Sequence, residues 1–276
     1  MWEGVGGKFF GWHFSRLCLG QFIVQTVQMG VSVSRSTRYL LPALALLAVT
    51  VCWAQGFMGR RIVQNNPPPT EFVAARWHFG TNGYIGHMGW SHNYPQSDRH
   101  LNQFLKRATR IDVEEDSYRI VELGSDEVFD YPFAYVSEPG EMELTEREVD
   151  NLREFVGRGG FILIDDFDGP VQWEQMRSQV RRAFPGSDFE ALPIDHRVFR
   201  TYAVLETFED MADNVPGGSI TYYGLFTDTG ELAILAGLNN DLANFWDWYG
   251  DGRMPLKPST DAFRLGTNAV LHSMTH

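Results

Sequence analysis

Cysteine is scarce in this chain, and both of its cysteines, Cys18 and Cys52, lie near the N-terminus. The stretch from residue 71 to residue 276 contains none. This absence excludes a disulfide, a thiolate metal site and a cysteine nucleophile from most of the chain. Any chemistry in that stretch depends on other side chains.

Positive charge is also scarce, because 35 acidic residues outnumber 23 lysines and arginines and the formal net charge is −12. An acidic surface repels phosphate backbones, so we expect no nucleic-acid partner. The glycine-rich stretch 80–86 is neither a phosphate-binding loop nor a dinucleotide fingerprint, and no HExxH or G-x-S-x-G motif occurs. We therefore expect no cofactor, no metal ligand set and no serine-hydrolase site.

The N-terminal region carries the pattern of a secretory signal peptide. Arg35 and Arg38 precede an uncharged apolar run at 39–51, and Ala54 offers a small residue for cleavage. The run is shorter than the roughly 20 residues of a membrane span, and an uncleaved anchor is the alternative. We expect an exported protein, periplasmic or anchored on the outer side of the cytoplasmic membrane, and membrane contact only through this segment if it is uncleaved.

The sequence pattern divides the chain into four parts. Residues 1–28 precede Met29, which is a natural start for the signal, so we interpret them as an extension ahead of the true initiator. Residues 29–54 are the signal peptide or anchor, and 55–70, with three consecutive prolines, are a linker. Residues 71–276 fit a single domain.

Alternating strand and helix patterns in 71–276 predict an α/β domain with a mainly parallel sheet. Strands are expected at 72–79, 118–123, 133–136 and 161–164, and a hairpin at 220–235. Thr145 and Glu148 form a capping box for a helix that Gly157 ends. Two further helices are expected at 172–184 and 262–274. A short helix should begin after Asp241 as its N-cap, and another after Ser97 or Asp98 as its N-cap.

Several stretches resemble the exported bacterial family called domain of unknown function 4159. They are 144–166, Trp90 with Tyr94-Pro95, 199–202, 241–248 and 263–276, so that the resemblance covers about residues 72–276. It implies a class I glutamine-amidotransferase-like fold, a flavodoxin-like three-layer sandwich. Amidotransferases of that fold carry a cysteine nucleophile on a strand-to-helix elbow, and the cysteine-free domain excludes this chemistry.

The candidate site lies where the buried strand 161–164 ends in Asp165, Asp166 and Asp168, because ligands of open α/β sheets bind at the carboxyl ends of strands. Neighbouring strand residues point to opposite faces, so Asp165 and Asp166 serve one site only if the strand has ended. Caps and backbone hydrogen bonds are the alternative use of these carboxylates.

The predicted site also includes residues from two other regions. They are histidines and large aromatic residues of the loop after the first strand, and a helix-capping aspartate near the C-terminus. We expect a ligand-binding surface lined by six residues: Asp165, Asp166, His87, His92, Trp90 and Asp241. The alternative for the aromatic residues is packing in the core. The leading hypothesis is a module that binds an envelope protein or a carbohydrate ligand. The competing hypothesis is a hydrolase of carbohydrate or envelope polymer that uses Asp and His as acid and base.

Overall fold

The computed structural model describes residues 64–83, 89–211 and 218–275, which belong to the unit Ile62–His276. The predicted signal segment at 29–54, the extension at 1–28 and His87 lie outside the described residues. Within those residues, every helix is too short or too polar to span a bilayer.

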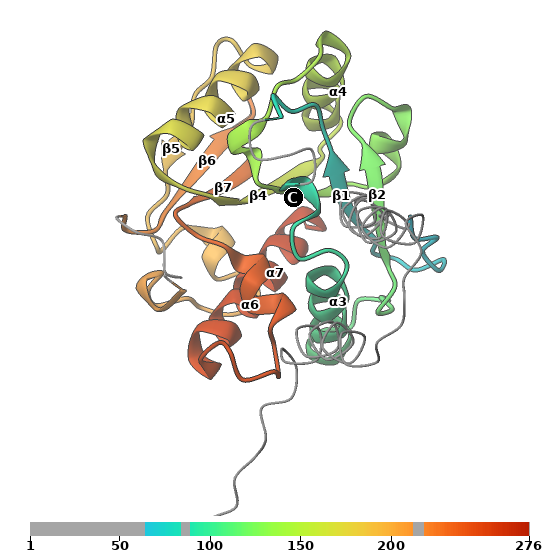
Figure 1. Ribbon diagram of the computed structural model, residues 1–276, viewed down its shortest axis with the longest axis vertical. Coiled ribbons are helices and arrows are strands. Elements are labelled where there is room, and N and C mark those ends of the chain that lie inside the picture. The colour runs from blue at the N-terminus through green and yellow to red at the C-terminus, as the bar shows by residue number, and fades with distance from the viewer. Residues whose placement is uncertain (1–63, 84–88, 212–217, 276) are drawn as a thin grey trace, which may run out of the picture. The chain divides into compact units, whose positions relative to one another are not determined.

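Seven strands of the described residues form one sheet in the order β2-β1-β3-β4-β7-β6-β5 (Figure 1). Their bounds are β1 Ala74–His78, β2 Tyr118–Glu122, β3 Phe133–Ser137, β4 Phe161–Phe167, β5 Glu190–Ala191, β6 Thr221–Phe226 and β7 Leu232–Leu238. The pairs β1–β2, β1–β3, β3–β4 and β4–β7 are parallel, whereas β6 and β5 add antiparallel pairs at one edge. The predicted α/β class with a mainly parallel sheet is confirmed.

Helices cover both faces of the sheet (Figure 1). On one face lie α3 Gln96–Ala108, α6 Leu242–Asp247 and α7 Leu256–Ser273, and on the other lie α4 Glu146–Gly157 and α5 Gly169–Ala183. Two apolar cores result, one on each face. In β4, Phe161 and Leu163 belong to the first core and Ile162 and Ile164 to the second, as expected of a parallel strand buried on both faces.

Local sequence signals place the helix ends correctly in two cases. In α4 the Thr145 hydroxyl accepts the N–H of Glu148, and the Glu148 carboxylate in turn accepts the N–H of Thr145, which confirms the capping box. In α6 the Asp241 carboxylate accepts the N–H of Asn244, 2.9 Å away, which confirms the predicted cap. Both signals involve residues three positions apart, so they need no tertiary contact.

The predicted cap of α3 is wrong, because this helix begins after Pro95 without a side-chain cap. Asp98 instead forms a buried ion pair with Arg76, and Ser97 accepts a hydrogen bond from the same guanidinium. The last helix also starts earlier than predicted, at Leu256 rather than at 262. A tertiary ion pair therefore replaced a local interaction at the start of α3.

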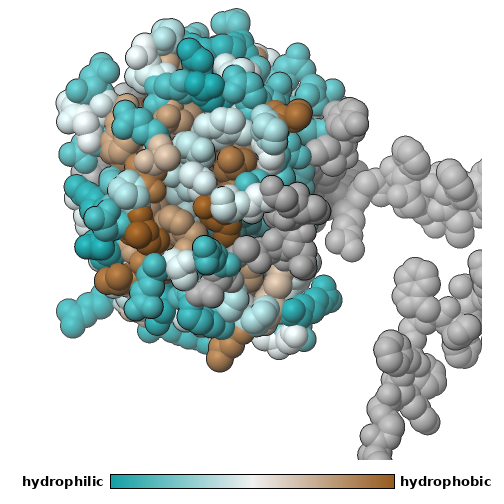
Figure 2. Space-filling view, turned by 90° about the vertical axis from the view of Figure 1, so that its left-hand side faces the viewer, coloured by the Kyte–Doolittle hydropathy of each residue, from teal (hydrophilic) through white to brown (hydrophobic). Residues whose placement is uncertain are grey.

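The sheet edge at β5 is short. With two residues, β5 covers only part of β6, and the pairing runs from Glu190 to Gly224 and from Ala191 to Tyr223. Figure 2 shows the face on this side of the molecule, where hydrophobic residues gather in the middle and hydrophilic ones surround them.

Candidate functional site at the carboxyl edge of the sheet

The site lies at the carboxyl ends of β1, β3, β4 and β7. His92, Glu138 and Asp241 follow β1, β3 and β7, and Asp166 lies near the end of β4 itself; we call these four residues the carboxyl-edge cluster. One ligand atom each of His92, Asp166 and Asp241 lie within 4.8 Å of one another. Glu138 adds an oxygen 3.6 Å from Nδ1 of His92. Four separate elements thus bring one imidazole and three carboxylates together.

Asp166 lies near the centre of the cluster because β4 is irregular at this residue. The pairing of β4 with β7 shifts register between Ile164 and Phe167, and Asp166 has a left-handed φ of 64°. Its N–H donates to the carbonyl of Asn240, 3.0 Å away, which replaces a regular ladder bond. Its Oδ2 lies 2.7 Å from Nδ1 of His92. The irregularity therefore supplies the turn that brings Asp166 to the cluster.

Asp165 has a different role from Asp166. Its side chain is fully buried, and Oδ2 accepts the Tyr135 hydroxyl at 2.8 Å and the N–H groups of Leu242 at 2.8 Å and Ala243 at 3.2 Å. Burial and, to a smaller extent, the neighbouring Asp166 carboxylate raise the pKa of Asp165 to about 7. Asp165 therefore fixes the start of α6 beneath the cluster, as the alternative reading of backbone hydrogen bonding expects.

A buried arginine holds the segment that carries His92. The guanidinium of Arg76 pairs with Asp98 at 2.8 Å and donates to the carbonyls of Trp90 and His92, both at 3.1 Å. It also lies 4.6 Å from the ring centre of Tyr135. Because these contacts fix the main chain of His92, the imidazole meets Asp166 in a defined position. The hydrogen bond to Asp166 raises the pKa of His92.

Glu138 is the cluster residue that the sequence analysis missed. It follows β3 directly, adopts a left-handed φ of 49°, and packs its carboxylate against Gly89. Burial and the charge of Asp166 raise its pKa to about 7. The rule that pointed to Asp166, a carboxylate at the carboxyl end of a strand, also identifies Glu138, because Ser137 ends β3.

The six predicted lining residues separate into groups. His92, Asp166 and Asp241 come together in the cluster. Trp90 is only 5% exposed and packs its ring against His78, 4.4 Å between centres, so it belongs to the core, as does the buried Asp165. These two residues support the site instead of lining its surface. His87 lies outside the described residues.

An imidazole nitrogen with several carboxylate oxygens is a donor set that suits a divalent cation. Nδ1 of His92 lies 2.7 Å from Oδ2 of Asp166, so a cation bound by both atoms would replace their hydrogen bond, since ligands lose protons when a metal binds. The prediction that no metal binds here stays a prediction, and the geometry motivates the opposite hypothesis.

The fold and the cluster together define an α/β domain with a polar site at the carboxyl edge of its parallel strands. The model of the family described as Domain of unknown function (DUF4159) matches residues 79–274, and the chain belongs to this family. The expected family resemblance is thus confirmed. No curated protein matches the chain.

Proposed function

We propose that the domain is a ligand-binding module that holds a divalent transition-metal cation, such as Zn²⁺ or Mn²⁺, at the carboxyl-edge cluster. The observation that carries this proposal is the approach of one imidazole nitrogen and two carboxylate oxygens, from three separate segments, to within 4.8 Å. His92, Asp166 and Asp241 supply these atoms. The imidazole favours a transition metal over Mg²⁺ or Ca²⁺.

The charge balance of the cluster supports a cationic ligand. Glu138, Asp166 and Asp241 are three carboxylates, and the buried Asp165 adds a fourth carboxyl below them. The guanidinium of Arg76 is already paired with Asp98. Like charges at such distances disfavour one another, and a bound divalent cation removes that repulsion.

The arrangement of the strands supports both the finer fold assignment and the position of the site. The order β2-β1-β3-β4-β7 of the parallel strands corresponds to the flavodoxin-like order. In such sheets the chain reverses its direction of winding between β1 and β3, and ligands bind outside the carboxyl ends at that point. His92 follows β1 and Glu138 follows β3, so the cluster lies beside this point.

The test is a calorimetric titration of the chelator-treated full chain with Zn²⁺ and with Mn²⁺, followed by metal analysis after dialysis. We expect about one ion per chain and a loss of affinity of about tenfold or more in His92→Ala and Asp166→Asn. The control is Asp126→Asn, which changes an exposed aspartate that pairs with Arg147. Equal affinity in the wild type and in both cluster variants would contradict the proposal.

The hydrolase hypothesis has support in the same geometry, because His92 and Asp166 come from separate segments and lie within hydrogen-bond distance. Acid–base catalysis needs such a pair near a bound substrate. The test is the release of reducing ends from envelope polysaccharides by the wild type and by Asp166→Asn. Metal binding without any release by the wild type would favour the binding module.

We also propose that the protein is exported and that the module acts in the bacterial envelope on a protein or carbohydrate partner. The signal pattern at 29–54 supports this location. N-terminal sequencing of the protein recovered from the envelope fraction tests it. A peptide from residues 1–28 in the mature protein would contradict the expected start at Met29.

A further inference from the structure

A cavity of about 850 Å³ lies at the other end of β4, away from the carboxyl-edge cluster. Three segments line it: the end of α4 with the glycines before β4 (153–160), the end of α5 with the loop after it (183–187), and the β6–β7 hairpin (225–233). We call it the amino-edge cavity. At about 3.3 Å per residue, the five steps along β4 from Phe161 to Asp166 place it about 17 Å from the cluster.

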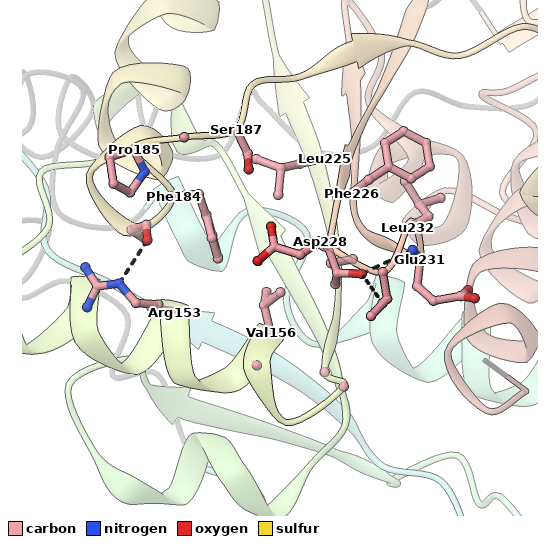
Figure 3. Close-up of a pocket in the computed structure, with 18 residues that line it drawn as sticks. Arg153, Val156, Phe184, Pro185, Ser187, Leu225, Phe226, Asp228, Glu231 and Leu232 are labelled. Atoms are coloured by element: carbon pink, nitrogen blue, oxygen red, sulfur yellow. Dashed lines mark hydrogen bonds between the residues drawn. The ribbon is translucent and has the colours of Figure 1, made fainter.

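The floor of the amino-edge cavity is apolar. Val156, Ala183, Leu225, Leu232 and Ala233 line it, and each is at most 5% exposed. Figure 3 shows Val156, Phe184 and Leu225 around the middle of the cavity. The volume falls within the range of pockets that bind small organic molecules, and such a floor favours a hydrocarbon or aromatic group.

One carboxylate gives this cavity its charge. Figure 3 shows the Asp228 side chain pointing from the hairpin turn into the cavity, between Phe184 and Val156. Within the part of the chain that the structure describes, this carboxylate has no hydrogen-bond or ion-pair partner. Glu231, the other acidic lining residue, instead lies 3.9 Å from Arg197. Asp228 is therefore the acidic group available to a ligand.

The basic residue of the lining does not offset this charge. Arg153 donates from Nε to the carbonyl of Ala183 at 2.9 Å (Figure 3) and pairs its Nη1 with Asp150 at 2.7 Å. Its guanidinium thus stabilises the last turn of α5. Both α4 and α5 end at the cavity, and helix C-termini carry partial negative charge. The cavity therefore favours a cation over an anion.

From the apolar floor and the inward-pointing carboxylate we infer that the amino-edge cavity binds a small amphiphilic amine, with the apolar body on the floor and the protonated nitrogen beside Asp228. This site goes beyond the proposed metal function, since it shares no residue with the carboxyl-edge cluster. Charge complementarity selects the amine, and the volume selects a molecule of drug-like size.

The experiment compares three probes of matched shape on the full chain: 4-phenylbutylamine, 4-phenylbutanol and 4-phenylbutyrate. Ligand-observed NMR titrations measure the affinity of each. We expect the amine to bind about three- to fivefold more tightly than the alcohol, which is the range of a partly exposed ion pair, and the carboxylate to bind most weakly. The preference for the amine should shrink as salt is added.

Two matched variants locate the charge. Asn is as common in turns as Asp, so Asp228→Asn should preserve the hairpin turn. It should reduce the affinity for the amine three- to fivefold and leave the affinity for the alcohol unchanged. Glu231→Gln, whose carboxylate lies by Arg197, should leave both affinities unchanged. Asp166→Asn should also leave amine binding intact while it weakens metal binding, so that the failure of one site is distinguishable from the failure of the other.

Three results would overturn the inference. Equal binding of the amine and the alcohol would remove the role of charge. Equal effects of Asp228→Asn and Glu231→Gln would place the nitrogen elsewhere. The absence of amine binding at concentrations of about 10 mM, where weak complexes of small ligands are detected, would show that the cavity does not take this class of molecule.

Discussion

The two ends of β4 differ in the side chains that gather there and in how those side chains are bonded. At its carboxyl end, polar side chains from four segments meet and bond to one another, as His92 and Asp166 do at 2.7 Å. At its amino end, Gly159 and Gly160 border a cavity with an apolar floor and one inward-pointing carboxylate. A ligand at the first end must replace existing hydrogen bonds, whereas a ligand at the second end fills space.

Different parts of the structure hold the residues at the two ends of β4. The carboxyl-edge cluster depends on a buried ion pair and a buried carboxyl below it, Arg76–Asp98 and Asp165. The amino-edge cavity lies between the ends of α4 and α5 and the β6–β7 hairpin. Substitutions below each site therefore distinguish the two designs, and the largest effects are expected where charge is buried.

The largest effect is expected from Arg76→Met. Removal of the guanidinium leaves Asp98 buried without its partner and frees the carbonyls of Trp90 and His92. Loss of one member of a buried pair typically costs about 3–5 kcal/mol. Urea denaturation should show this loss in the free energy of unfolding, and Arg147→Met, at an exposed pair with Asp126, should cost less than about 1 kcal/mol. Equal losses would show that the buried pair does not organise the carboxyl edge.

At the amino end the corresponding substitution is Gly160→Ala. A Cβ at this position would overlap the ring of Phe155, which cannot retreat because it packs edge-on against Trp77. Overpacking of this kind costs about 1–3 kcal/mol. Gly157→Ala is the control, since a Cβ there meets no described atom within 4 Å and Gly157 is itself a helical residue of α4, where alanine is favoured over glycine. Thermal unfolding should show a lower Tm for Gly160→Ala and an equal or higher one for Gly157→Ala.

A third prediction concerns the pH dependence of the metal-free protein. Because the pKa of Glu138 is raised to about 7 in the folded state, this state holds more protons than the unfolded one between about pH 4.5 and pH 7. The free energy of unfolding should therefore fall as pH rises through this interval. The groups that face Glu138 are Asp166, His92, Glu141 and Asp168.

Glu138→Gln tests that prediction, because an amide does not titrate. In chelator-treated samples, the free energy of unfolding of the variant relative to the wild type should increase by about 1–2 kcal/mol from about pH 5 to pH 8. Solvent screening of this partly exposed group keeps the change below the full value. The exposed Glu154→Gln serves as a control and should leave the wild-type pH profile unchanged. A parallel shift of the Glu138→Gln and wild-type curves would refute the prediction.

The smallest effect is expected on the loop beside the amino-edge cavity. Asp188 accepts hydrogen bonds from Arg177 and from the N–H of Phe189, and the contact with Arg177 lowers its pKa to about 2. Its stabilising effect is thus present above about pH 4 and is lost as pH falls through about 2. Because the pair is exposed, Asp188→Asn should cost less than about 1 kcal/mol near neutrality. At high salt, which screens the ion pair, urea denaturation should show equal free energies of unfolding for the wild type and Asp188→Asn.

Local signals account for what the sequence predicted of the fold. The capping box at Thr145 and Glu148, the cap at Asp241 and the hairpin between β6 and β7 each join residues close in the chain, and all three are confirmed. Asp98 shows the limit of such signals. Its carboxylate could bond to the start of α3, but the buried Arg76, twenty-two positions away, takes it instead.

The candidate site was predictable in position but not in composition. The carboxyl ends of strands pointed to Asp166, and the same rule applied to β3 would have added Glu138. The left-handed φ at Asp166 gives no distinct sequence signal, because aspartate is also common in turns that contain no left-handed residue. The amino-edge cavity arises where three separate turns leave space, and no single segment encodes it.

The continuous hydrogen bonding of β4 to β3 and, through Ile164, to β7 has a further consequence. A strand that pairs on both sides changes little in length, so the distance between the two ends of β4 stays nearly constant. Spectroscopic labels placed on the helices and loops can be calibrated against it. A change in the distance between labels on titration with a metal or an amine would then be assigned to the surrounding segments and not to β4.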